Sequence, residues 1–277
     1  MKAINIAKFK FMFIKNMEMA EYFVWPINEI VTDHAIGTLD VVSVLAACIV
    51  LNVPPIPTEI LMYIFSRFQY RICADGGANI LYDTIPGLHT DSTKSTFLPD
   101  LVIGDLDSIR PEVSTFLNDI GVEVRKVEDQ DNTDLDKALL HAQSILPTSI
   151  PQFIVIAGSI GSYEGRIDQF FAVMNSMYSY VESNLKLISV GDRSIMIVLN
   201  SGLHVLNLPP AALHQHCGLV PAFGPVEEVT TTGLRWDLNK EMGPLKFGRL
   251  ISTNNIVDNL QVTISTSQPV LYTLTYR

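Results

Sequence analysis

Short apolar runs alternate with segments of helical spacing over residues 41–190, and this alternation constrains the fold more than any other feature of the sequence. The runs are rich in Val, Ile and Leu, as strands buried on both faces of a parallel sheet are. Such strands, interleaved with helical segments, indicate an α/β domain whose parallel sheet is covered by helices. The predicted strands are Val41–Val53, Tyr70–Ala74, Leu101–Ile103, Val122–Val127, Phe153–Ala157 and Leu185–Val190.

Helices are predicted between these strands. One begins at Pro111, which suits the first helical position, and ends before Gly121. A second begins at Thr133, whose side chain can cap the free amides together with Asp136. A third runs from Asp168 to Val181.

Helical spacing disappears after Ser189, and Gly, Pro and Asn separate short apolar segments instead. The pattern predicts an all-β sandwich or barrel over residues 191–277, after an α/β domain over residues 41–190. Residues 1–40 are expected to form an appended, loosely packed extension. The strands predicted in the second domain are Ile195–Leu199, Leu203–Leu208, Val226–Thr231, Leu245–Ser252, Leu260–Ser265 and Val270–Tyr276.

The composition excludes several classes of function. The formal net charge is −10 and no stripe of Lys or Arg occurs, which argues against nucleic-acid binding and favours divalent cations as partners of the acidic clusters. The longest apolar run, Val41–Leu51, is too short to span a membrane. Cys48, Cys73 and Cys217 are widely spaced in apolar stretches, so we expect reduced, buried thiols and a cytoplasmic protein.

The most specific chemical signal is Gly104-Asp105-Leu106-Asp107-Ser108, directly after a predicted strand. In an extended chain residues i and i+2 share a face, so the carboxylates of Asp105 and Asp107 are expected to point the same way. At the carboxyl end of a parallel strand, two such groups suit Mg²⁺. The alternative is a turn with Asp as its usual occupant.

Three further polar segments follow predicted strands. Glu128–Asp134 places four acids at a helix start, as caps or as ligands of a cation that carries phosphate. Ala74–Asn79 contains paired glycines that would let the backbone approach a ligand. Gly158–Gln169 is glycine-rich and includes Arg166, whose planar group fits phosphate oxygens or is simply exposed. In one parallel sheet all four segments would converge on a single edge.

Other candidates are weaker. His214-Gln215-His216-Cys217 has no second ligand pair at zinc-finger spacing, and a solvated loop is the better interpretation. No G-x-S-x-G motif is present, so acyl transfer has no support.

Taken together, these motifs resemble those of the thiamine pyrophosphokinase family. The resemblance runs from about Val41 to the end of the chain. It implies an α/β catalytic domain, a β-sandwich domain, and a homodimer with active sites between the catalytic domain of one chain and the sandwich of the other. The implied reaction is Mg²⁺-dependent transfer of a pyrophosphoryl group from ATP, the co-substrate, to thiamine. The matching segments are Ala74–Asn79 with Leu81-Tyr82-Asp83, Gly104–Ile109, Asp129–Asp134, Gly165–Gln169, Cys217–Pro221, Thr230–Trp236 and Ser252–Asn255.

The resemblance also implies roles for individual residues. The metal ligands would be Asp105, Asp107 and Asp134, and the catalytic set would add Arg166 and Asp168 to these three. ATP would contact Asp75, Gly76, Gly77, Asn79, Thr133 and Arg166. Thiamine would contact Gln130 and, from the second domain, Trp236, Ser252 and Asn254. Trp236 would come from the partner chain and stack on the aminopyrimidine ring; without the resemblance it would be an ordinary sandwich core residue. The loop 158–166 is longer than the family pattern.

Two other functions stay open at this point. A D-x-D motif after a strand also serves aspartyl-phosphate chemistry, so a Mg²⁺-dependent phosphohydrolase is the rival enzyme. A non-catalytic protein that binds thiamine or a nucleotide is the third possibility.

Overall fold

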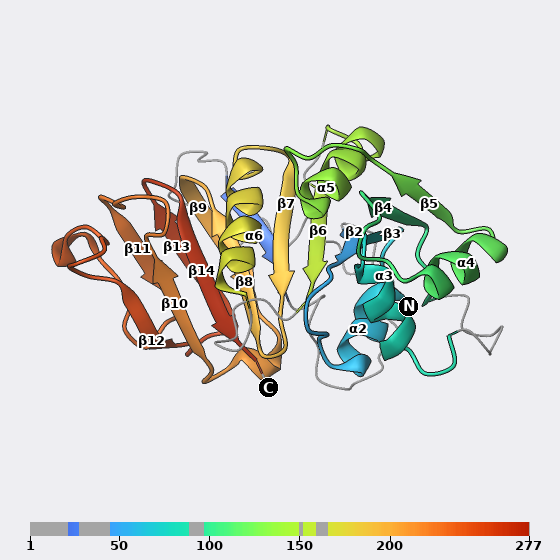
Figure 1. Cartoon of the computed structure of the whole chain (residues 1–277). Coiled ribbons are helices and arrows are strands. Elements are labelled where there is room, and N and C mark those ends of the chain that lie inside the picture. Colours follow the sequence, from blue (N-terminus) through green and yellow to red (C-terminus); the bar gives the residue numbers. More distant parts are fainter. Residues whose placement is uncertain (1–21, 28–44, 89–96, 150–151, 159–165, 277) are drawn as a thin grey trace.

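The structure is a computed structural model of the chain and describes residues 22–27, 45–88, 97–149, 152–158 and 166–276. Its centre is a ten-stranded sheet (Figure 1). The strands of this sheet are β2 (Leu45–Val50), β3 (Tyr70–Ala74), β4 (Leu101–Gly104), β5 (Glu123–Lys126), β6 (Gln152–Ala157), β7 (Leu185–Val190), β8 (Ser194–Leu199), β10 (His216–Val220), β12 (Ser252–Ile256) and β14 (Val270–Thr275). Their order across the sheet is β12-β10-β14-β8-β7-β6-β2-β3-β4-β5.

The six strands from β7 to β5 are parallel. Their side chains alternate between two cores, as the period of two in a strand requires: in β2, Cys48 and Val50 lie in one core, and Ala47 and Ile49 in the other. Both faces are buried except in the edge strand β5, which explains the continuous apolar runs in the sequence. The predicted α/β architecture is confirmed.

Within the described residues, five α-helices cover the two faces of this sheet: α2 (Thr58–Phe65), α3 (Gly77–Thr84), α4 (Pro111–Asp119), α5 (Asp134–Ile145) and α6 (Ile167–Ser179). The first three pack on the face that carries Val50, and α5 and α6 pack on the face that carries Ile49. The helices predicted from Pro111, Thr133 and Asp168 are confirmed.

The chain order places a switch point at the centre of the parallel strands. From β2 the chain proceeds outward through β3, β4 and β5, and it then returns to add β6 and β7 on the other side of β2. In open α/β sheets, ligands bind outside the carboxyl ends of the strands near such a point. The loops after β2, β3, β4 and β6 therefore border the expected site.

A second sheet of four strands, β1 (Tyr22–Pro26), β9 (Gly202–Asn207), β13 (Gln261–Thr266) and β11 (Val229–Thr232), lies in the order β1-β9-β13-β11. It shares one core with the antiparallel part of the large sheet, where Leu206 and Ile264 meet Ile197 and Tyr272. The predicted sandwich is thus present. One of its layers continues the large sheet, because β7 pairs antiparallel with β8, so the predicted boundary at residue 190 does not separate two sheets.

Strand β1 lies inside the predicted N-terminal extension. It pairs parallel with β9. Trp25 is buried, donates from Nε1 to His204 Nδ1 (3.2 Å) and meets the ring of Phe153 edge-on at 5.7 Å between centroids. The expectation of a loosely packed extension is therefore wrong for Tyr22–Ile27. Residues 1–21 and 28–44, which include the start of the predicted strand Val41–Val53, lie outside the described residues.

Two predictions in the sandwich half are also wrong. The predicted strand Leu245–Ser252 does not form as one element. Leu245 makes isolated bridges to Val226 and Leu250, the chain turns at Gly248, whose φ is +79°, and Ser252 already belongs to β12. The segment expected to be a solvated loop contributes His216 and Cys217 to β10, because Cys217 packs into the core.

The cysteines are free and buried, as predicted. Burial raises the pKa of the Cys48 and Cys73 thiols above their ordinary value and that of Cys217 to about 12, so none is poised as a thiolate. Of the helices in the described part of the chain, none has the length and apolar character to cross a membrane.

Candidate active site

Asp75 follows β3 directly and turns its side chain into the protein. Its carboxylate accepts hydrogen bonds from the backbone N–H groups of Ser108 (3.0 Å) and Ile109 (3.1 Å). The residue is 1% exposed and has φ +42°, a strained backbone of the kind that gathers at functional sites. Asp75 therefore holds the loop after β4 against the end of β3.

The loop after β4 carries Asp105 and Asp107. Leu106 between them has φ +64°, so the backbone is not extended and the expectation that the two carboxylates share a strand face is wrong. Asp105 is half-buried, and its Oδ1 accepts from the N–H of Asp107 (3.3 Å). Asp107 is exposed, and its Oδ1 accepts from the hydroxyl of Ser108 (2.8 Å).

Asp134, the first residue of α5, lies against the same loop. Its Oδ1 accepts from the N–H of Asp105 (3.3 Å) and from Nζ of Lys137 (3.0 Å). Gly104 provides the necessary space, because a Cβ there would lie 2.6 Å from Cβ of Asp75 and 2.9 Å from Oδ1 of Asp134. A side chain at position 104 would force these carboxylates apart.

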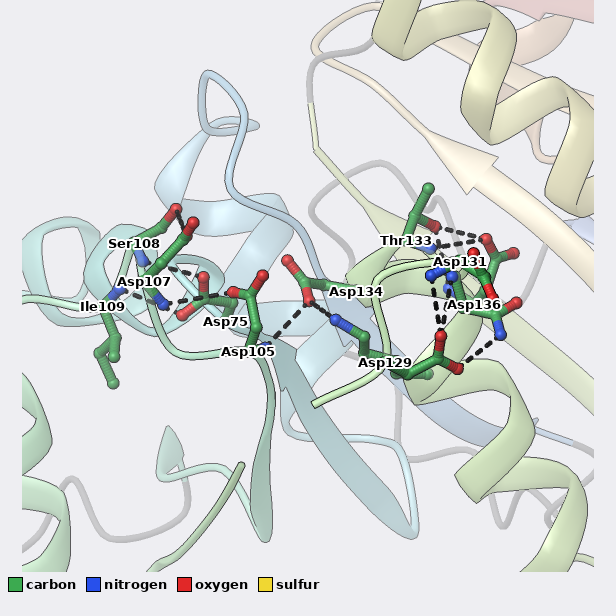
Figure 2. Close-up of polar contacts among 12 residues, drawn as sticks. Asp75, Asp105, Asp107, Ser108, Ile109, Asp129, Asp131, Thr133, Asp134 and Asp136 are labelled. Atoms are coloured by element: carbon green, nitrogen blue, oxygen red, sulfur yellow. Dashed lines mark hydrogen bonds and ion pairs between the residues drawn. The ribbon is translucent and has the colours of Figure 1, made fainter. Parts of the chain in front are cut away.

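Figure 2 shows Asp75, Asp105 and Asp134 converging from the end of β3, the end of β4 and the start of α5. Each offers a carboxylate oxygen within 4.8 Å of the others. In this three-carboxylate group, Asp75 stands where the sequence predicts Asp107. Burial raises the pKa of Asp75 above its ordinary value, and the charge of Asp134 acts in the same direction. A cation would relieve this repulsion, and hard carboxylate oxygens are the ligands that Mg²⁺ prefers.

The residues after Asp75 pack closely against neighbouring parts of the fold. A Cβ at Gly77 would lie 2.1 Å from the carbonyl oxygen of Val50, and one at Gly76 would lie 2.4 Å from the side chain of Asn52. Both glycines thus let α3 approach the end of β2. Asn79 donates to the carbonyl of Ser108 (2.9 Å) and accepts from the N–H of Arg110 (3.0 Å), which braces the loop after β4.

The turn before α5 is organised by Asp129, whose carboxylate accepts from the N–H of Asp131 (2.9 Å) and from the side-chain amide of Asn132 (2.7 Å). Thr133 caps α5: its Oγ1 accepts from the N–H of Asp136 (3.2 Å), and its own N–H donates to the Asp136 carboxylate (3.1 Å). The predicted capping box is confirmed. Gln130 is exposed at the tip of this turn.

Arg166 and Asp168 stand at the start of α6, after β6, and so at the same edge of the sheet as the three-carboxylate group. They form an ion pair, with Nε of Arg166 3.1 Å from Oδ1 of Asp168, and both side chains are more than half exposed. The hydrogen bond from Arg166 lowers the pKa of Asp168 below its ordinary value. Residues 159–165 of the predicted glycine-rich loop lie outside the described residues.

Trp236 belongs to the sandwich half, and its side chain is 56% exposed. The alternative of a core residue is therefore wrong. The backbone N–H of Trp236 donates to Oδ1 of Asn255 (3.2 Å), and Nδ2 of Asn255 donates back to the backbone carbonyl of Trp236 (2.9 Å). Ser252 is buried beside Asn255, and Asn254 is exposed with φ +57°.

The structure does not bring all the predicted site residues together in one chain. Trp236 is held by β12, which is seven strand positions from β3 in the ten-stranded sheet. At the usual spacing of about 4.8 Å between strands, this is roughly 34 Å. Figure 1 shows β12 and β3 toward opposite ends of the molecule. Gln130, by contrast, lies in the turn that leads to Asp134.

Sequence reasoning missed Lys137 and Asn255. Lys137 is buried beside Asp134, and the signal available was its position three residues after an acid on one helix. Asn255 holds the backbone of Trp236, but the sequence offers nothing that separates it from its neighbour Asn254.

Two sequence profiles match the chain. The profile "Thiamin pyrophosphokinase, catalytic domain" matches residues 61–189, and "Thiamin pyrophosphokinase, vitamin B1 binding domain" matches residues 203–271.

Similar proteins occur in plants and fungi. Thiamine pyrophosphokinase 1 of Oryza sativa subsp. japonica is 34% identical over 222 residues, which cover 77% of this chain and 81% of the rice protein. Thiamine pyrophosphokinase 1 of Arabidopsis thaliana is 34% identical over 77% of this chain and 80% of its own length. The crystal structure of yeast thiamin pyrophosphokinase shares the fold, with a TM-score of 0.73 and 20% identity over 95% of this chain and 93% of the yeast chain.

Proposed function

This chain belongs to the thiamin pyrophosphokinase family, and from that membership we propose that it transfers a pyrophosphoryl group from ATP to the hydroxyl of thiamine. The products would be thiamine diphosphate and AMP. The chain is an enzyme of the thiamine diphosphokinase class. The observation that carries the proposed chemistry is the convergence of Asp75, Asp105 and Asp134 at the carboxyl edge of the parallel strands.

In this proposal the three-carboxylate group holds Mg²⁺. The donors fit the ion, because they are hard oxygens within 4.8 Å of one another and Gly104 leaves the space between them open. Bound there, Mg²⁺ would neutralise charge on the phosphate oxygens during transfer. Asp107, exposed next to the group, stays a candidate for a further contact to the ion.

Arg166 is the proposed phosphate contact on the β6 side. Its ion pair with Asp168 is exposed on both sides, and exposed pairs of this kind contribute little stability. Breaking this ion pair would therefore cost little free energy. Arg166 could then donate hydrogen bonds from its planar guanidinium group to phosphate oxygens. Asp168 and Thr133 complete the proposed lining of the transfer site.

The proposed thiamine contacts are Gln130, in the turn that leads to Asp134, and Trp236 with Ser252 and Asn254 at the other end of the sheet. Because about 34 Å of sheet separates these two sets in one chain, we propose that a partner chain supplies Trp236. The active site would then lie between the α/β part of one chain and the sandwich of the other in a homodimer. Alignment of two substrates in such a cleft can lower a barrier by about 7–11 kcal/mol.

The deciding experiment measures AMP in the presence of ATP and Mg²⁺, with and without thiamine. We expect AMP and thiamine diphosphate to form together, only when thiamine is present, and to stop when divalent cations are chelated. Release of phosphate or ADP without thiamine would identify a phosphohydrolase. Binding of both ligands without turnover would identify a non-catalytic binding protein.

A further inference from the structure

Lys137 is the one residue of α5 whose charge is buried against the three-carboxylate group. Its side chain is 3% exposed and its Nζ lies 3.0 Å from Oδ1 of Asp134, which is 32% exposed. Its neighbours on the helix, Leu135 and Ala138, are buried in the core. A buried ammonium group is costly unless a partner compensates it, so its position next to Asp134 is a specific feature of the site.

The contact fixes the orientation of Asp134. In the described part of the chain, the hydrogen bonds to this carboxylate come from Lys137 and from the N–H of Asp105, and both end on Oδ1. The same oxygen faces Gly104. Oδ2 is thereby left with the capacity to accept a further ligand.

The contact also changes the charge of the site. Asp75, Asp105 and Asp134 carry three formal negative charges when ionised, and Lys137 reduces the sum to −2, which one divalent cation cancels. A lysine in this position weakens the attraction of the group for a free cation. Nucleotide phosphates bring additional negative charge and oxygen ligands, and so restore that attraction.

We propose that Lys137 is a positioning residue that orients Asp134 and keeps the three-carboxylate group from capturing a free divalent cation, so that the cation binds tightly only together with the nucleotide. This inference rests on the metal role given under the proposed function. It assigns to Lys137 a control over the order in which cation and ATP occupy the site.

The test is binding of Mn²⁺, followed by electron paramagnetic resonance of the free ion, with and without ATP and in the absence of thiamine. Lys137→Met removes the charge, and Lys137→Gln removes the charge but keeps a hydrogen-bond donor for Asp134. Both should bind Mn²⁺ about tenfold more tightly than wild type without ATP, the effect of one unit charge near a divalent ion in a solvated site. With ATP bound, the difference should shrink.

Two further variants serve as controls. Lys137→Arg keeps the charge and should restore the wild-type dependence on ATP. Arg67→Met removes a positive charge that lies over the Tyr63 ring just before β3, at the amino end of the parallel strands and away from the three-carboxylate group, and should leave Mn²⁺ binding unchanged. Circular dichroism and thermal melting establish that each variant is folded, and Lys137→Gln retains a donor for Asp134 if Lys137→Met does not fold.

The outcomes separate the two proposals. Affinity for free Mn²⁺ that is unchanged or lower in both uncharged variants would overturn the role of Lys137 while leaving the metal site intact. Failure of the wild-type protein to bind Mn²⁺ even with ATP would instead overturn the metal role itself.

Discussion

The proposed division of the site between two chains can be tested by complementation. Small-molecule pockets hold about 300–1,000 Å³, or roughly 7–10 Å across. The seven strand positions between β12 and β3 span about 34 Å, so a single thiamine cannot touch Trp236 and the three-carboxylate group of the same chain. A chain with Asp105→Asn and a chain with Trp236→Ala should each be impaired alone.

Random pairing of equal amounts of the two variants makes half of the dimers hybrids. In a two-fold symmetric dimer with shared sites, each hybrid contains one site with both defects and one intact site. The two variants are therefore co-expressed with different tags, and the rate of AMP formation is measured at limiting thiamine. The mixture should regain about a quarter of the wild-type rate, whereas either variant expressed alone should regain none. If hybrids are isolated and no activity returns, the two residues act within one chain or not at all, and the shared site is refuted.

Two other substitutions test the geometry and the electrostatics. Gly104→Ala should lower turnover about 100-fold with the fold retained, because Asp75 and Asp134 must move by about 1 Å to admit the methyl group. Gly191→Ala is the control, because a Cβ there meets only ordinary contacts, at 3.4 Å or more. Equal turnover rates for the two variants would contradict this account. Burial lowers the pKa of His204 to about 4 from an ordinary 6.5, so the unfolded chain binds a proton that the folded chain refuses between these values. The free energy of unfolding should then fall by about 3 kcal/mol as the pH drops from 6.5 to 4. When free energies of unfolding from urea titrations are plotted against pH, the slope between pH 6.5 and 4 should be shallower for His204→Gln than for the wild-type protein. Identical slopes in the two proteins would exclude His204 as the source.

The parallel half of the fold could be predicted because its strands are buried on both faces, which leaves continuous apolar runs such as Phe153–Ala157. The sandwich half gave a weaker signal. Leu245 and Leu250 look like the ends of a strand, but Gly248 turns the chain between them. Tyr22–Pro26 is apolar enough for a strand, yet no partner is near it in sequence, since β9 lies almost 180 residues later.

The meeting of several loops at one edge of the sheet followed from topology, but the identity of the three carboxylates did not. Extended geometry predicts that Asp105 and Asp107 act together, and the left-handed conformation of Leu106 breaks that relation. Asp75 joins the group because its side chain is drawn inward by the amides of Ser108 and Ile109. These contacts depend on tertiary structure, and no spacing in the sequence encodes them.

Strand β1 covers the hydrogen-bonding edge of β9 and part of the apolar surface around Phe153. Among the described strands it stands at the rim of the four-stranded sheet, where it occupies the hydrogen-bonding groups of β9. A chain shortened to begin at Leu45 would leave those groups unpaired and uncover Phe153, and an open strand beside an apolar surface is a template for edge-to-edge aggregation. The few residues around Trp25 thus cover backbone and apolar surface that would promote aggregation if exposed.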